Sequence, residues 1–164
     1  MLWPSIALLA FVTLQRLSEL AFARANTQRL LAEGAREYAP GHYPLIVAVH
    51  AGWLMTLWLL AIGRPIHVPL LVLFLLLQAG RIWVLRTLGP RWTTRIIVLP
   101  GAPLVTGGPY RFASHPNYLV VTGEIAVLPL VFGLWKVALL FSALNAIVLA
   151  IRIRAENRAL GAVA

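Results

Sequence analysis

Five long apolar runs divide this sequence and leave the polypeptide few ways to fold in water. A transmembrane helix needs about 20 mostly apolar residues, and several of the runs approach that length. Hydrophobic residues make up 60% of the chain and charged residues only 12%, whereas soluble domains are about 25% charged. We therefore predict an all-α integral membrane protein with five transmembrane helices in a single domain, residues 1–164. The predicted spans are residues 2–22, 44–62, 66–85, 118–132 and 137–151.

Positive charge is distributed unevenly among the segments that join these runs. The formal net charge is +9, and most arginines lie in residues 23–42, 86–112 and 152–158. The alternate turns carry only Arg64 and Lys136. Because lysine and arginine collect in cytoplasmic loops, we predict an N-terminus outside the cytoplasm and a cytoplasmic C-terminus. The charges flank membrane spans and form no long basic run, so we expect no nucleic-acid partner.

The richest local signal is the segment 107–118, which we call the motif loop. Gly107 and Gly108 permit unusual backbone angles, and Pro116 suits the first turn of a helix, where its missing N–H costs nothing. The N–H groups at such a helix start favour an anion. A purely structural turn is the alternative. Before this loop, residues 92–98 are rich in β-branched and aromatic side chains, and a turn at 100–103 separates them from 104–106. That pattern predicts a short cytoplasmic β-hairpin or extended pair before the fourth helix.

Polar residues also stand out at the C-terminus and inside the spans. Arg152 and Glu156 lie four residues apart, so they share a helix face, although a helix end whose arginines reach the lipid surface also explains them. A short turn between the last two helices would bring this tail to the motif loop. Within the spans, Glu124 is a candidate because charge in a membrane is expensive; a Glu paired with an arginine is the alternative. His50 is either a ligand or a residue that hydrogen-bonds neighbouring helices. The chain has no cysteine, which excludes disulfides and thiolate metal sites, and we predict no metal.

Three features resemble the isoprenylcysteine carboxyl methyltransferase family. They are the motif loop from Gly108 to Tyr118, the apolar hairpin after it and the pattern Arg-x-Arg-x-Glu-x-x-x-Leu. The related phospholipid methyltransferases share the first of these motifs. The resemblance covers residues 80–160. Two positions depart from it: Ser114, where the family usually has arginine, and Asn157, where many members have glutamate.

The resemblance implies a bacterial inner-membrane methyltransferase that uses S-adenosylmethionine, with S-adenosylhomocysteine as product. It implies a cofactor site at Tyr110, His115, Pro116, Tyr118 and Glu156. Catalytic roles fall to Glu156 and to Arg152 or Arg154, one of which orients the acceptor. His50, Trp53 and Glu124 are the candidate acceptor-binding residues within the spans. The oligomeric state cannot be predicted from these motifs.

The expected acceptor is a lipophilic small molecule that enters from the bilayer and lies among membrane lipids. A carboxylate acceptor needs no base, whereas a phenol must lose its proton, and Glu156 or His115 could accept it. Short bacterial members resemble enzymes that act beside polyketide synthases. We therefore expect O-methylation of a lipidic phenol or polyketide. Carboxyl methylation of an isoprenylcysteine-like substrate is one alternative, and a non-catalytic lipid-binding subunit is the other.

The predicted orientation can be tested with a reporter fused to the C-terminus. A reporter that is active only outside the cytoplasm should give no signal, because the arginine-rich tail stays inside. A strong signal from this fusion would contradict the orientation.

Overall fold

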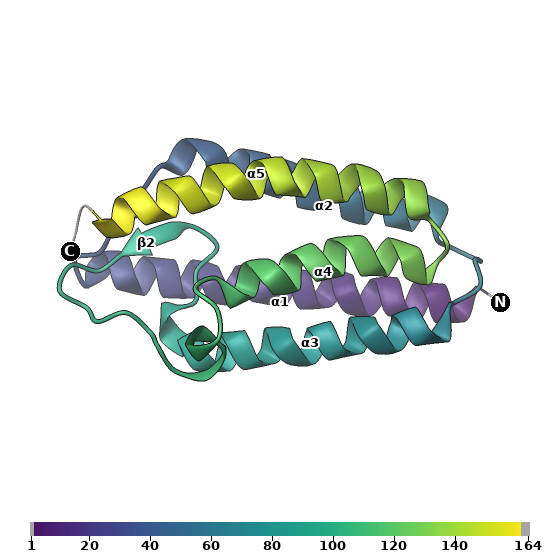
Figure 1. Ribbon diagram of the computed structural model, residues 1–164, viewed down its shortest axis with the longest axis horizontal. Coiled ribbons are helices and arrows are strands. Elements are labelled where there is room, and N and C mark those ends of the chain that lie inside the picture. The colour runs from purple at the N-terminus through teal and green to yellow at the C-terminus, as the bar shows by residue number, and fades with distance from the viewer. Residues whose placement is uncertain (1, 162–164) are drawn as a thin grey trace.

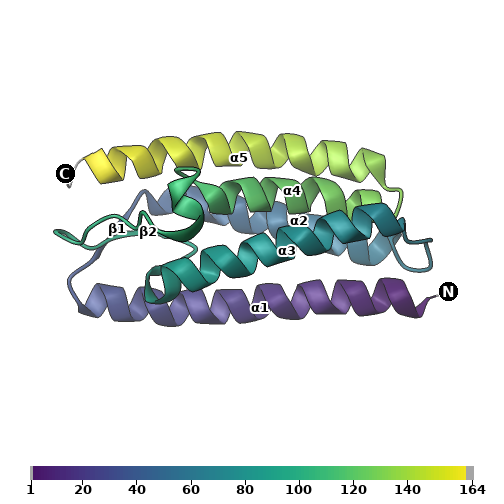
Figure 2. The ribbon, with the colours of Figure 1, turned by 60° about the horizontal axis from the view of Figure 1, so that its bottom comes forward.

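The computed structural model describes residues 2–161, which form a bundle of five helices (Figure 1). The helices run along a common direction, and the two ends of the chain lie at opposite ends of the bundle (Figures 1 and 2). The bounds are α1 Trp3–Ala32, α2 Tyr43–Leu60, α3 Val68–Leu88, α4 Pro116–Val131 and α5 Trp135–Gly161. Three short 3₁₀ helices, Pro40–His42, Gly89–Arg91 and Gly108–Arg111, lie in the connections.

Four of these helices, all except α4, are long and apolar enough to cross a membrane. Helix α4 is apolar but has 16 residues, which corresponds to about 24 Å at 1.5 Å per residue. The predicted all-α membrane architecture is thereby confirmed, and the protein is an integral membrane protein. Pro116 is the first residue of α4, as its missing N–H predicts.

Helix α1 continues well beyond its predicted apolar span and ends only at Ala32. Gly34, at a φ of 96°, follows this end, and only glycine adopts such an angle without strain. Most residues of the added turns are exposed, but Asn26 is buried against the loop that follows α3. Asn26 donates from Nδ2 to the carbonyl oxygens of Gly89 at 3.2 Å and Trp92 at 2.9 Å. The first helix therefore helps to position the loop that follows α3.

A two-stranded antiparallel sheet joins two distant connections. Strand β1, Arg36–Tyr38, pairs with β2, Ile96–Val98, with Arg36 opposite Val98. The extended structure predicted before the fourth helix is present in β2, but its partner comes from the first connection and not from residues 104–106. An ion pair of Glu37 with Arg95 at 3.1 Å supports the pairing. The sheet ties both connections together at the C-terminal end of the bundle (Figure 1).

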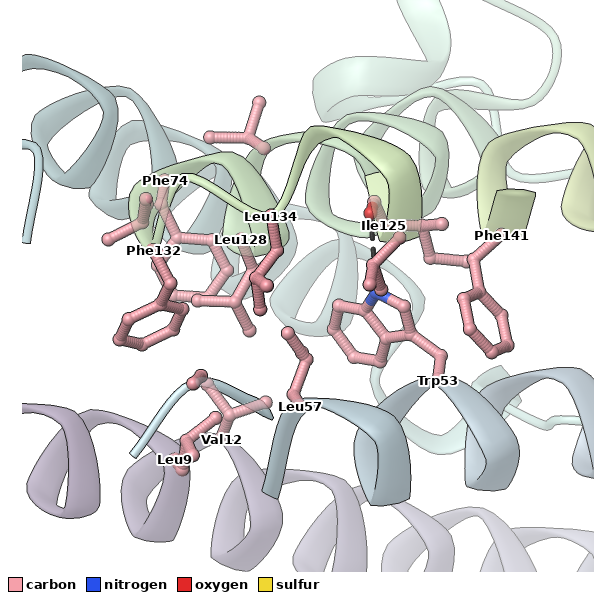
Figure 3. Close-up of a cluster of buried hydrophobic side chains, with 14 residues drawn as sticks. Leu9, Val12, Trp53, Leu57, Phe74, Ile125, Leu128, Phe132, Leu134 and Phe141 are labelled. Atoms are coloured by element: carbon pink, nitrogen blue, oxygen red, sulfur yellow. Dashed lines mark hydrogen bonds between the residues drawn. The ribbon is translucent and has the colours of Figure 1, made fainter. Parts of the chain in front are cut away.

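The apolar core forms around α4, which lies between α3 and α5 in both ribbon views (Figures 1 and 2). Figure 3 shows Trp53 and Leu57 of α2 facing Ile125 and Leu128 of α4. The Trp53 Nε1–H donates to the Ile125 carbonyl oxygen at 3.2 Å. Burial of an aromatic residue with its one polar atom satisfied is the stable arrangement in a core.

A network of buried charges joins three helices beside this core. Glu124 of α4 accepts from Arg81 Nε of α3 at 2.7 Å and from an Arg16 Nη of α1 at 2.6 Å. Arg81 also donates to Glu19 of α1 at 2.9 Å, and Gln78 donates to Glu124 at 2.8 Å. Two arginines and two glutamates cancel in charge, which is what an apolar environment demands. Glu124 is thus paired, the alternative that the sequence had left open.

Replacing Glu124 with glutamine keeps the side-chain shape but leaves Arg16 and Arg81 with a single carboxylate between them. Breaking a buried ion pair costs about 3–5 kcal/mol, so we expect Glu124→Gln to unfold at a clearly lower temperature in detergent. Glu33→Gln is the matched control, because the exposed pair of Glu33 with Arg29, at 3.6 Å, is worth at most about 1 kcal/mol. Equal unfolding temperatures for the two variants would contradict the clamping role of Glu124.

Candidate active site

Two neighbouring cavities lie towards the end of the bundle that carries the sheet and the motif loop. One cavity of about 490 Å³ is bounded by residues 91–106, the motif loop and the end of α5. We call it the polar cavity, because Tyr110, His115 and Glu156 lie in its wall. The other, of about 310 Å³, lies among α1, α2, α4 and α5 and is mostly lined by apolar side chains. We call it the apolar cavity.

The motif loop is held against α3 by close packing at Gly108. Gly108 has a φ of 54°, and a Cβ placed there would lie 2.4 Å from the hydroxyl oxygen of Thr87. Neither the angle nor the space admits a larger residue. After this contact the chain turns into α4 at Pro116, which is buried. The His115 ring, just before the helix, stacks on the Tyr118 ring with centroids 5.1 Å apart.

The Tyr118 hydroxyl is the point where the motif loop meets the C-terminal tail. It donates to the Glu156 carboxylate and accepts from Arg152 Nε at 2.8 Å. Another Arg152 N–H donates to the carbonyl oxygen of Thr94 at 2.8 Å. His115 Nδ1 lies 3.9 Å from the same Glu156 oxygen. Residues from the two motifs therefore form one polar cluster across the α4–α5 hairpin.

Tyr110 lines the polar cavity but does not titrate near neutral pH. Burial of the phenol, and then the nearby Glu156 carboxylate, raise the pKa of Tyr110 to about 12. Both effects disfavour the charged phenolate. Tyr110 is accordingly neutral and can form hydrogen bonds and stacking contacts. Acid–base catalysis in this cavity would involve other groups.

The apolar cavity opens sideways between α1 and α2. Leu17, Leu20 and Val47 line it, yet their side chains are 58%, 44% and 45% exposed. In a membrane that exposure faces lipid, so a lipophilic molecule has a lateral route into the cavity. His50 and Trp53 also line it, and His50 Nδ1 lies 2.9 Å from the Ile46 carbonyl oxygen.

The decisive geometric feature is that the two cavities share a wall. The residues that line both are Trp92, Thr93, Asn117, Tyr118 and Arg152. A polar molecule in one cavity and a lipophilic molecule in the other would both lie beside Tyr118 and Arg152. The arrangement suits transfer of a small group between two molecules of very different polarity.

The remaining predicted site residues lie farther from this wall. Arg154 is exposed and lines neither cavity. Glu124 does not line the apolar cavity; its network partners Arg16 and Arg81 do. Sequence reasoning did not single out Asn117, whose Oδ1 is buried without a hydrogen-bond partner among the described residues. The sequence signal that could have pointed to Asn117 was its position directly after His115-Pro116.

Comparison with known proteins finds a family match over the region that contains both motifs. The family model described as "Isoprenylcysteine carboxyl methyltransferase (ICMT) family" matches residues 70–162, which include the motif loop, the C-terminal tail and most of the polar-cavity wall. The chain belongs to the ICMT family. It is also 40% identical over 158 residues to uncharacterized protein YpbQ of Bacillus subtilis (strain 168), covering 93% of this chain and 94% of the relative. No solved structure matches the chain significantly.

Membership of the ICMT family makes this protein a membrane methyltransferase, and such enzymes generally use S-adenosylmethionine. The resemblance expected from the motif loop and the tail is confirmed. The relative's printed name assigns no substrate, so the acceptor has to be argued from the site.

Proposed function

We propose that this ICMT-family protein transfers a methyl group from S-adenosylmethionine to the hydroxyl of a lipidic phenol or polyketide. The observation that carries the proposal is the wall at Asn117, Tyr118 and Arg152 that the polar and apolar cavities share. Methyl transfer from a sulfonium is an in-line displacement, and holding two reactants in line supplies much of the acceleration. Residues that border both cavities can hold a donor and an acceptor side by side for that alignment.

The chemistry of the polar cavity fits the methyl donor. Its volume of about 490 Å³ lies within the range of about 300–1,000 Å³ for small-molecule sites. Arg91 and Arg95 in its wall suit the carboxylate of the donor, and Glu156 suits its positive charges. His115 and Tyr110 offer ring surfaces for the adenine. When bound, the donor supplies an electrophilic methyl group.

The apolar cavity favours a lipid acceptor with a small reactive head. Its opening between α1 and α2 admits an alkyl chain from the bilayer, and Arg152 lies at its inner end. In the described part of the chain, Arg152 engages two of its five N–H donors, so further donors are free to orient an acceptor oxygen. The basic residues around this end of the bundle, including Arg91, Arg95 and Arg158, support a cytoplasmic orientation. The donor would then enter from the cytoplasm.

The direct test supplies detergent-purified protein with isotopically labelled S-adenosylmethionine and a long-chain alkylphenol. We expect the label in an alkylphenyl methyl ether identified by mass, together with thermal stabilisation by S-adenosylhomocysteine. Label in a methyl ester of a prenylated cysteine, with none in the phenol, would replace the proposed acceptor by the carboxylate alternative. Absence of both stabilisation and transfer would contradict the enzyme and favour a lipid-binding subunit.

Two single variants distinguish the arginines of the tail. Arg152→Lys should lose methyl transfer by roughly 100-fold, because lysine cannot reproduce the planar fork that holds Tyr118 and Thr94 together, and small misplacements of reactants have costs of this size. Arg154→Lys should retain near wild-type turnover, because Arg154 is exposed and lines neither cavity. Steady-state rates with the alkylphenol provide the comparison. Equal losses in both variants would contradict this assignment of roles.

A further inference from the structure

The hydroxyl of Tyr118 is placed between a charged acceptor and a charged donor of hydrogen bonds. A phenol hydroxyl has one O–H to donate and two lone pairs to accept with. The Tyr118 O–H donates a hydrogen bond to the Glu156 carboxylate, and its oxygen accepts one from Arg152 Nε. One lone pair of its oxygen therefore stays available among the described residues. The ring of Tyr118 lines the apolar cavity as well as the polar one.

Glu156 lies on the other side of Tyr118 from the proposed acceptor. The carboxylate lines the polar cavity and does not line the apolar cavity. A base must lie within hydrogen-bond reach of the proton that it removes, directly or through one intervening group. Glu156 does not line the apolar cavity, whereas Tyr118 lines it and its oxygen keeps a lone pair that no described residue uses.

We propose that Tyr118 relays the proton of the acceptor hydroxyl to Glu156, which allows the site to methylate weakly acidic hydroxyl acceptors. The inference rests on the proposed methyl transfer and adds how the acceptor is activated. Tyr118 is then a catalytic residue that touches the acceptor, and Glu156 is the base at the far end of the relay.

The step balances in atoms and charge. The acceptor O–H bond breaks as its proton moves to the Tyr118 oxygen, while the Tyr118 proton moves to Glu156 Oε2. The acceptor oxygen forms a bond to the methyl carbon, and the bond from that carbon to the sulfonium sulfur breaks with its electron pair left on sulfur. One sulfonium and one carboxylate become a neutral thioether and a neutral carboxylic acid. Arg152, donating to the Tyr118 oxygen, stabilises the negative charge that develops there.

The structure also provides a route for the proton to leave. Glu156 and His115 are 29% and 24% exposed at their side chains, and His115 Nδ1 lies 3.9 Å from the Glu156 oxygen. Both line the polar cavity. The proton on Glu156 therefore passes to solvent or to His115 on the side of the donor, without re-entering the apolar cavity.

Two acceptors of different acidity test the relay. An ordinary long-chain alkylphenol has a pKa near that of tyrosine, about 10, and must lose its proton during transfer. A polyfluorinated alkylphenol of the same chain length is already ionised at neutral pH. General-base catalysis contributes about 10²- to 10⁴-fold. At saturating S-adenosylmethionine, we expect Tyr118→Phe and Glu156→Gln each to slow methylation of the ordinary phenol by roughly 100-fold or more, and to slow methylation of the fluorinated phenol by about tenfold at most.

Matched controls are Tyr38→Phe and Glu33→Gln, which change the same residue types outside both cavities. Thermal stabilisation by S-adenosylhomocysteine, measured for every variant, reports folding and donor binding without turnover. Equal losses with the two phenols in Tyr118→Phe and Glu156→Gln would overturn the relay and leave the methyltransferase intact. A wild-type protein that methylates neither phenol would overturn the proposed function, and the relay with it.

Discussion

Glu124 is a carboxylate inside a bundle of membrane helices, and such a charge has to be neutralised where it stands. Arg16 of α1 and Arg81 of α3 neutralise it, with Glu19 balancing the second arginine. The network holds α1 against α3 and α4. Apolar side chains alone would do little to orient these helices relative to one another, because lipid tails are as apolar as the side chains. Helices α1 and α4 both line the apolar cavity. The ion pairs that hold these helices together therefore also set the shape of that cavity.

Most of the fold could be predicted from the sequence because membrane spans are long, apolar and punctuated by proline and glycine. Pro116 marked the start of α4. The short turn between α4 and α5 required these two helices to lie side by side. The pairing of β1 with β2 could not be predicted, because three residues such as Arg36–Tyr38 carry no alternation of their own. The length of α1 was left open by the sequence, since its polar turns lie beyond the apolar span and are packed on the loop at Trp92 by Asn26.

The site was partly predictable for the same reason. Tyr118 and Glu156 are far apart in sequence, but the α4–α5 hairpin brings them into contact. The sequence leaves Arg152 and Arg154 equivalent, whereas in the structure only Arg152 lines the cavities, because residues two apart on a helix face directions about 200° apart. Asn117 has no charge or ring to mark it, and only the meeting of two cavities reveals its position. The membrane location and the methyl-transfer chemistry therefore follow from local patterns, while the residues that line both cavities are brought together by packing.

An experimental structure with both S-adenosylhomocysteine and a long-chain alkylphenol bound would test the shared site directly. We expect the adenosyl group in the polar cavity near His115, the phenol oxygen against Tyr118 and Arg152, and the alkyl chain leaving between α1 and α2. The sulfur and the phenol oxygen should face each other beside Tyr118 and Arg152, with no side chain between them. An alkyl chain that leaves between another pair of helices, with the phenol oxygen away from Tyr118, would contradict this arrangement.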